Sequence, residues 1–304
     1  MSEEVAHQIP HRAEASLLGL AVADALGAPF EFASPEQARA GADAGLEMTG
    51  GGPWAAGEWT DDTAMALRLA ECLAERGVPL DFDDLARRYG QWAAAGPKDI
   101  GNITRSALTG IEGAADARRN AEQLHEATGH TAGNGTIMRI APLAFAPLGD
   151  EDLASVAREE ARLTHWDEAA GDASAAYCLA LRAVAVGADP IAAAGEVSLH
   201  ERSREAVAIA SSNDQASAAA LAAQGGTCWS TLAVALCAFA APDYEEGVSW
   251  AISLGHDADT NAAVAGALLG CRDGIDSIPV RWLEPLLEQE RLRAAAAGIV
   301  SLHG

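Results

Sequence analysis

The chain has 304 residues, of which 49% are hydrophobic, enough for a substantial buried core. It carries 44 acidic and 20 basic residues, and its net charge of −24 disfavours binding to nucleic-acid phosphates, which needs clustered Lys and Arg. The 5 cysteines include no CxxC pair, so neither a disulfide framework nor a zinc site is expected.

The location of the protein is predicted from two further features. No uninterrupted apolar stretch approaches the ~20 residues of a membrane span, and the first residues lack the basic and then apolar order of a secretory signal. We therefore expect a cytoplasmic protein with no membrane partner and, for a helical chain of this length, a monomer. A salt-rich cytoplasm is a hypothesis that would account for the acidic excess.

Alanine-rich segments, few aromatic residues and little alternation of polar with apolar residues predict a chain that is nearly all helix, with no convincing strand. Many segments begin at Asp, Ser, Thr or Pro and end near Gly or Pro, as capped helices do. The predicted helices are 13–26, 35–41, 63–76, 82–95, 104–113, 120–126, 136–145, 150–163, 167–186, 190–196, 201–211, 228–239, 244–254, 260–270 and 279–283. No linker interrupts them, so a single domain over residues 1–304 is expected.

The first predicted helix stops in the segment DALGAPFEF at residues 24–32, which leaves Glu31 between Phe30 and Phe32. A carboxylate in apolar company has a raised pKa and can serve as a general acid or base. A surface glutamate after a helix stop is the alternative interpretation.

Two acid-rich motifs follow, TDDT at 60–63 and DADT at 257–260, and each opens directly onto a predicted helix. The first is reached through a long loop, 41–59, of the kind that is often functional in a compact domain. Helix capping explains one acidic side chain at each start. It does not explain two neighbouring carboxylates, which repel each other unless a cation or a donor lies between them. Brought together, the motifs would offer the oxygen ligands that Mg²⁺ and Mn²⁺ prefer.

Three weaker polar signals lie between these motifs. DIGN at 99–102 and GNGT at 133–136 are loops, and glycines before a helix let backbone N–H groups approach an anion. A simple turn is the alternative. His165 in THWD at 164–167 precedes an alanine-rich helix, where a histidine is often only a cap or a core residue.

Taken in order, DALGAPFEF, WTDDTAMAL, DIGN, GNGTIMR, LTHWD and GHDADTNAAVAGALLG resemble the ADP-ribosylglycohydrolase family. The resemblance covers about residues 13–270 and implies a compact all-α fold, an orthogonal bundle of many helices in one domain. It also implies two Mg²⁺ or Mn²⁺ ions as cofactors, and hydrolysis of the glycosidic bond between ADP-ribose and an acceptor such as a modified protein side chain. The partner would then be ADP-ribose or an ADP-ribosylated acceptor.

The resemblance also suggests roles for individual residues. Glu31 matches the family's acidic residue near the scissile bond. The remaining matches are Thr60, Asp61, Asp62, Asp257, Asp259 and Thr260 as metal ligands, Gly133, Asn134 and Gly135 as a diphosphate loop, His165 as a ligand-binding histidine, and Asp99, Gly101 and Asn102 as a loop beside the ribose. The chain departs from the family pattern at Ala23 and at His256, and the second departure puts the preferred acceptor in doubt.

Two other functions stay open at this level. One is a hydrolase of another N-glycoside or of a small molecule derived from ADP-ribose. The other is a non-catalytic homologue that binds ADP-ribose, which would be expected to have lost a metal-ligating Asp or Glu31. An ordinary metal-free glycosidase would leave the two acidic motifs unexplained.

Overall fold

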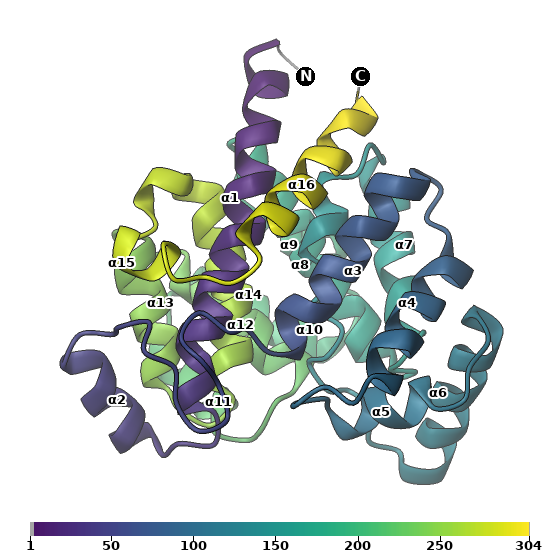
Figure 1. The fold of residues 1–304 in the computed structure, drawn as a ribbon, viewed down its shortest axis with the longest axis horizontal. Coiled ribbons are helices and arrows are strands. Elements are labelled where there is room, and N and C mark those ends of the chain that lie inside the picture. Colours follow the sequence, from purple (N-terminus) through teal and green to yellow (C-terminus); the bar gives the residue numbers. More distant parts are fainter. Residues whose placement is uncertain (1–2, 304) are drawn as a thin grey trace.

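The computed structural model describes residues 3–303, and the side chains of residues 11–303. Sixteen α-helices fill that range, and it contains no β-strand, only two isolated bridges at Gly51–Trp54 and Gly133–Thr227. The predicted all-α fold is confirmed. Figure 1 shows the helices crossing at many angles around a central pair, α1 and α14.

Most of the helices follow one another with short connections, and the longest connections lie between α2 and α3 and between α6 and α7. In the first half of the chain they are α1 (Glu3–Gly27), α2 (Pro35–Asp43), α3 (Asp61–Arg76), α4 (Phe82–Ala94), α5 (Asn102–Leu108), α6 (Ala114–Thr128) and α7 (Asp150–Ala161). In the second half they are α8 (Glu168–Ala185), α9 (Pro190–Val197), α10 (Glu201–Ser211), α11 (Gln215–Ala222), α12 (Cys228–Ala238), α13 (Tyr244–Ser253), α14 (Ala258–Asp273), α15 (Val280–Leu283) and α16 (Gln289–Val300).

Three differences from the sequence predictions have physical causes. The helices α11 and α16 were not predicted, because alanine-rich segments without a clear apolar stripe carry little periodic signal. The predicted helix 136–145 is wrong, since residues 134–139 form turns and Ala141–Phe145 is a 3₁₀ helix. Pro142 cannot donate a backbone hydrogen bond, and the Gly135 carbonyl instead accepts from the Arg139 guanidinium at 3.0 Å.

The central pair, α1 and α14, packs antiparallel through glycines. A Cβ added at Gly266 would lie 2.5 Å from the Gly19 carbonyl oxygen, and one at Gly270 would lie 2.3 Å from the Ala15 carbonyl oxygen. Only residues without a side chain allow two backbones to approach so closely. This contact brings the end of α1 to the start of α14, where the second acidic motif lies.

One segment of this core, His11–Phe30, is long and apolar enough to cross a membrane by length and composition alone. The prediction that no stretch approaches that length is therefore wrong. In the fold, however, 83% of the apolar window is buried against other helices, as in the core helix of a packed domain.

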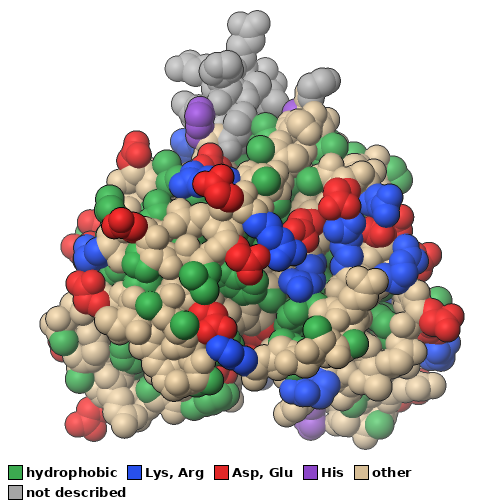
Figure 2. Space-filling model, in the orientation of Figure 1, with side chains coloured by type: hydrophobic (Ala, Val, Ile, Leu, Met, Phe, Trp, Pro, Cys, Tyr) green, Lys and Arg blue, Asp and Glu red, His purple; other side chains and the backbone are tan. Residues whose placement is uncertain are grey.

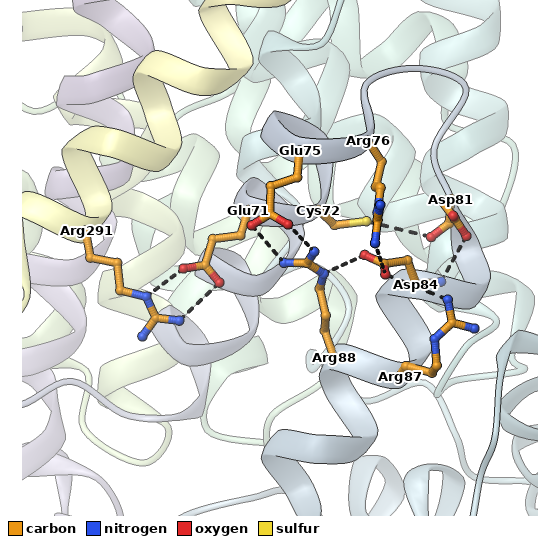
Figure 3. A network of polar contacts seen from close by, with 9 residues as sticks. All are labelled: Glu71, Cys72, Glu75, Arg76, Asp81, Asp84, Arg87, Arg88 and Arg291. Carbon is orange, nitrogen blue, oxygen red and sulfur yellow. Dashed lines mark hydrogen bonds and ion pairs between the residues drawn. The ribbon is translucent and has the colours of Figure 1, made fainter.

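The helix that carries the first acidic motif, α3, is held from two sides. Arg88 on α4 pairs with Glu75 of α3 at 2.6 Å, and Arg291 on α16 pairs with Glu71 of α3 at 2.6 Å (Figure 3). Single exposed pairs contribute little, but a network that spans three helices restrains the orientation of α3. Charges of both signs are interspersed over the visible face of the molecule (Figure 2).

Candidate active site

The two acidic motifs meet where α1 ends and α3 and α14 begin. A Cβ added at Gly27, the last residue of α1, would lie 2.5 Å from the Asp259 Cα. The Thr260 hydroxyl donates to Asp62 Oδ2 at 3.3 Å, across 198 positions of sequence. The fold therefore brings together the residues that the sequence predicted to converge. In Figure 1 this region lies in the lower half of the molecule, and Figure 2 shows its lower edge indented.

A cleft of about 810 Å³ opens at this meeting point. Most of the predicted site residues line it, namely Glu31, Asp61, Asp99, Gly101, Asn102, Gly133, Asn134, Gly135, His165, Asp257, Asp259 and Thr260. Thr60 and Asp62 are buried behind this lining: Asp62 accepts a hydrogen bond from the lining residue Thr260, and the Thr60 hydroxyl donates to Asp62. The sequence did not single out a role in the site for Phe32, Gly225 or Gly226, which also line the cleft.

Two buried carboxylate oxygens at the base of the cleft have no hydrogen-bond partner among the residues that the structure describes. They are Asp62 Oδ1 and Asp259 Oδ1, on side chains that are 0% and 2% exposed. Burial and repulsion from neighbouring carboxylates hold both pKa values well above the usual range for aspartate. An unpartnered buried carboxylate is costly unless an ion compensates it. These oxygens therefore fit a hard divalent cation.

The carboxylates fall into two groups that share Asp259. Ligand oxygens of Asp24, Asp62 and Asp259 lie within 4.8 Å of one another, and so do those of Glu31, Asp99 and Asp259. Sets composed only of oxygen donors suit Mg²⁺ or Mn²⁺ rather than zinc. The predicted metal ligands Asp61 and Asp257 belong to neither of these two groups.

The capping interpretation accounts for the threonine but not for the aspartates. Thr60 caps α3 through its side-chain oxygen, which accepts from the Asp62 backbone N–H at 3.4 Å. Asp257 occupies the cap position of α14 but makes no side-chain cap hydrogen bond. The carboxylates of Asp61, Asp257 and Asp259 are thus directed to other partners or to the cleft.

Asp24 was quoted within the first motif but was not predicted as part of the site. It is fully buried, and it accepts hydrogen bonds from the Thr60 N–H at 3.0 Å, the Thr63 N–H at 3.0 Å and the Thr63 hydroxyl at 2.6 Å. These contacts fix the first turn of α3. Burial raises the pKa of Asp24 to about 6, and hydrogen bonds from Thr63 and Thr60 oppose that rise. The available sequence signal was a single acidic residue inside an apolar helix.

The predicted diphosphate loop has a second role that the sequence did not indicate. The Asn134 side chain donates to Asp257 Oδ2 at 2.6 Å and to the Thr231 hydroxyl at 3.0 Å. Its backbone N–H donates to the Gly226 carbonyl at 3.0 Å. A Cβ at Gly226 would lie 2.3 Å from Asp257 Oδ2, so this position has no room for a side chain. The loop therefore orients the second acidic motif.

The loop at residues 99–102 supports the first motif in a similar way. The Gly101 N–H donates to Asp61 Oδ2 at 3.3 Å. Asp99 is half-buried and, after burial itself, is the largest cause of the raised pKa of Asp61. Asn102 is exposed at the start of α5 and lines the cleft.

Glu31 is half-buried at the mouth of the cleft. Burial raises its pKa to about 8, with added repulsion from Asp99, Asp257 and Asp24. The sequence predicted apolar rings on both sides of Glu31, but only one of the two phenylalanines is packed in the core. Phe30 packs against the core, whereas Phe32 is 86% exposed.

Phe32 and His256 form a strained rim beside Glu31. Both adopt left-handed backbone conformations, with φ of 62° and 56°, which are rare for bulky side chains. The Phe32 N–H donates to the His256 carbonyl at 2.6 Å, and the His256 N–H donates to the Ala33 carbonyl at 2.9 Å. These bonds hold an exposed aromatic ring at the entrance.

His165 also lines the cleft. It is 2% exposed and lies against the glycine loop, since a Cβ at Gly133 would be 3.1 Å from its Nε2 and one at Gly135 would be 2.8 Å from its Cε1. Trp229 does not line the cleft. It is partly buried and stacks with Arg202, whose guanidinium carbon lies 5.6 Å from the ring centroid.

Comparison with known proteins identifies the family. The sequence matches the family model described as ADP-ribosylglycohydrolase over residues 6–304. The chain belongs to the ADP-ribosylglycohydrolase family. The match extends beyond the residues 13–270 that carried the resemblance, and it includes α16.

This ADP-ribosylglycohydrolase is similar along most of its length to proteins with assigned activities. It is 32% identical to the ADP-ribosyl-[dinitrogen reductase] glycohydrolase of Rhodospirillum rubrum, over 96% of this chain and 97% of the relative. It is 31% identical to the ADP-ribosylarginine hydrolase Tri1 of Pseudomonas putida (strain GB-1), over 94% of this chain and 76% of the relative.

A solved structure described as an ADP-ribosylglycohydrolase-related protein complex superposes with a TM-score of 0.74 and 34% sequence identity. The similarity covers 98% of this chain and 100% of that one. Family and relatives together show that the protein is a glycohydrolase enzyme. The cleft described above is its candidate active site.

Proposed function

We propose that this glycohydrolase cleaves the bond between ADP-ribose and an acceptor in a reaction that depends on two Mg²⁺ or Mn²⁺ ions. The observation that carries the proposal is the pair of buried, unpartnered oxygens on Asp62 and Asp259 at the base of the cleft. A protein that only bound ADP-ribose would gain nothing from this costly arrangement.

The proposed ligands are Thr60, Asp61, Asp62, Asp257, Asp259 and Thr260. Of these, Asp62 and Asp259 belong to the close carboxylate groups described above, which also include Asp24, Glu31 and Asp99. When bound, the cations supply positive charge that orients ribose hydroxyls, stabilises developing charge and lowers the pKa of a bound water. Asp24 and Asn134 act as positioning residues, since the hydrogen bonds described above tie them to Thr60, Thr63 and Asp257.

Glu31 is the proposed general acid or base. A carboxylic acid whose pKa is raised to about 8 is protonated at neutral pH and can donate that proton to the departing acceptor nitrogen or oxygen. Bound cations would lower this pKa. In its ionised form, Glu31 would accept a proton from the attacking water. Both roles require its position at the mouth of the cleft, beside the carboxylates.

The diphosphate is the substrate group that an acidic cleft would repel. Its proposed contacts are therefore the donors on the other side of the lining, the backbone N–H groups of Gly133 and Gly135 together with His165. Asp99, Gly101 and Asn102 line the part of the cleft beside Asp61 and are proposed to border the ribose.

Arginine is the acceptor that the entrance favours. Asp99 places an acidic side chain in the lining, and the exposed Phe32 ring offers a face on which a planar guanidinium can stack. The similarity to a protein named an ADP-ribosylarginine hydrolase supports this choice.

A turnover assay on arginine-linked, serine-linked and nucleic-acid-linked ADP-ribose, with Mg²⁺ and Mn²⁺ compared side by side, tests the proposal. Release of ADP-ribose from the arginine conjugate, abolished by chelation and restored by either ion, is the expected result. Hydrolysis that continues at the same rate in metal-depleted buffer would contradict the metal dependence. Release from the serine conjugate alone would contradict the acceptor assignment.

A further inference from the structure

A fully buried polar network lies behind the cleft wall and is used by none of the proposed catalytic steps. Its centre is Arg139, which is 0% exposed and pairs with the equally buried Glu160 at 2.7 Å. The Tyr89 hydroxyl also donates to Glu160, at 2.9 Å. A buried ion pair of this kind contributes little to stability by itself.

Every N–H of the Arg139 guanidinium has an acceptor. Nε donates to Glu160 Oε1 at 2.7 Å, and Nη2 donates to Glu160 Oε2 at 3.2 Å and to the Glu160 carbonyl at 3.4 Å. Nη1 donates to the Gly135 carbonyl at 3.0 Å and to the Thr164 hydroxyl oxygen at 2.8 Å. Because a guanidinium has no acceptor, the Thr164 oxygen must accept in this contact.

The direction of the next hydrogen bond follows from that constraint. Thr164 Oγ1 lies 2.8 Å from His165 Nδ1, and within the described residues this is its only other hydrogen-bond contact. If Nδ1 carried the proton, the buried hydroxyl of Thr164 would have no acceptor. With Nδ1 unprotonated, Thr164 accepts from Arg139 and donates to His165, so the buried Thr164 hydroxyl proton has an acceptor.

We infer that Arg139 and Thr164 fix His165 as the Nε2–H tautomer, which makes this imidazole an obligatory hydrogen-bond donor to an anionic oxygen of the substrate in the cleft. His165 lines the cleft, and its Nε2 lies beside the glycine loop that the diphosphate is proposed to contact. Burial, aided by the Arg139 charge, also lowers the pKa of His165 to about 3, so the ring stays neutral. This inference rests on the proposed function for the identity of the substrate oxygen.

Nitrogen-15 NMR of the His165 ring in the protein without metal or ligand tests the tautomer independently of any activity. Nδ1 is expected to resonate as an unprotonated ring nitrogen and Nε2 as a protonated one, in the wild type and in Thr164→Ser, which keeps the hydroxyl. In Thr164→Val both resonances should shift toward the average expected for two tautomers in exchange. A wild-type ring protonated at Nδ1, or Thr164→Val spectra equal to wild type, would overturn the inference.

Calorimetric titration with ADP-ribose tests the consequence for binding. Thr164→Val should weaken ADP-ribose binding about tenfold, as expected for loss of one well-oriented hydrogen bond, and Thr164→Ser should restore it. Ser174→Ala serves as the control, because it removes another fully buried hydroxyl, one that donates to the Ala170 carbonyl and does not contact His165. An equal loss of ADP-ribose affinity in Ser174→Ala would show that Thr164 affects binding only through the stability of the fold.

The two measurements separate the two claims. If wild-type protein has the Nε2–H tautomer but does not bind ADP-ribose, the proposed function and the substrate contact are contradicted. The claim that Arg139 and Thr164 fix the tautomer of His165 would still hold. If the protein binds ADP-ribose normally but His165 is protonated at Nδ1, only the claim that Arg139 and Thr164 fix the tautomer is contradicted. Substitution of Arg139 itself is a poor test, because removing one partner of a buried ion pair destabilises the fold.

Discussion

Thr260 donates a hydrogen bond from its hydroxyl to Asp62 Oδ2 at 3.3 Å, which joins the second acidic motif to the first across the base of the cleft. Both side chains are buried, and within the described part of the chain the other Asp62 oxygen has no hydrogen-bond partner. The contact shows that the two motifs converge on one point. It also leaves free the oxygens that a cation would use.

Replacement of Asp62 by Asn should have opposite effects on stability and on function. It removes one buried negative charge, so metal-free protein should gain about 1 kcal/mol in free energy of unfolding, because a repulsive buried carboxylate disappears. Turnover should fall by about two or more orders of magnitude through loss of a metal ligand. Thermal melting and initial rates measure both effects, and Asp259→Asn should behave alike. A stabilised Asp62→Asn variant that retains wild-type turnover would contradict the assignment.

Glu31→Gln separates binding from chemistry. The amide is nearly isosteric but cannot donate or accept the catalytic proton, so kcat should fall by about two or more orders of magnitude while ADP-ribose binding persists. Steady-state kinetics and calorimetry on the same preparation check the two parts. Glu36→Gln, an exposed change in the first turn of α2, is the matched control and should leave kcat unaltered. Near-normal kcat in Glu31→Gln would remove Glu31 from the mechanism.

Asn134→Ala should weaken metal binding although Asn134 is not itself a proposed ligand. The substitution deletes the donor that holds Asp257 at 2.6 Å, and loss of such an outer partner typically costs about 10- to 100-fold in metal affinity. Titration with Mn²⁺ measures the loss. Asn120→Ala is the control, since that amide donates to the Ala107 and Thr109 carbonyls away from the cleft. Comparable Mn²⁺ affinity in both variants would show that Asn134 does not position the site.

The raised carboxyl pKa values predict how stability depends on pH. Burial raises the pKa of Glu31 from its ordinary 4.5 to about 8 and the pKa of Asp24 from 3.8 to about 6. The native state then binds more protons than the unfolded state, so stability should fall as pH rises from about 4 to about 8. Melting temperatures of chelator-treated protein across this range check the slope.

Added Mg²⁺ or Mn²⁺ should reverse this trend, and the gain in melting temperature should be larger at pH 8 than at pH 5. A bound cation favours ionised carboxylates, and binding to the native state alone raises its stability by mass action. A melting temperature that rises with pH in metal-free protein, or that does not respond to either ion, would contradict the description of the cleft.

The sequence was sufficient for the helical class and for the identity of most cleft residues, because both depend on local pattern. Acidic pairs at helix starts and glycine loops are visible in short windows, and their order carries the family resemblance. The segment from residue 134 to 145 was misjudged, because its turns depend on Arg139 reaching back to the Gly135 carbonyl, a side-chain contact that periodicity does not encode.

Contacts between distant segments account for what the sequence did not reveal. Asp24 and Asn134 were visible as residues, but their roles depend on Thr63 and Asp257, which lie 39 and 123 positions away. The orientation of the Phe32 side chain likewise depends on a distant contact, the hydrogen bond from the Phe32 N–H to the His256 carbonyl. Such pairings follow from the antiparallel packing of α1 on α14, which short-range patterns do not specify.

Calorimetric titration of the chelator-treated wild-type protein with Mn²⁺ tests the central claim most directly. The wild-type protein is expected to take up two ions. The Asp62→Asn and Asp259→Asn variants should lose most of the heat of Mn²⁺ binding. Hydrolysis of ADP-ribosylarginine should appear only as the sites fill. A wild-type protein that takes up no Mn²⁺ or Mg²⁺, yet releases ADP-ribose at its full rate, would contradict the claim that the paired acidic motifs form a catalytic metal centre.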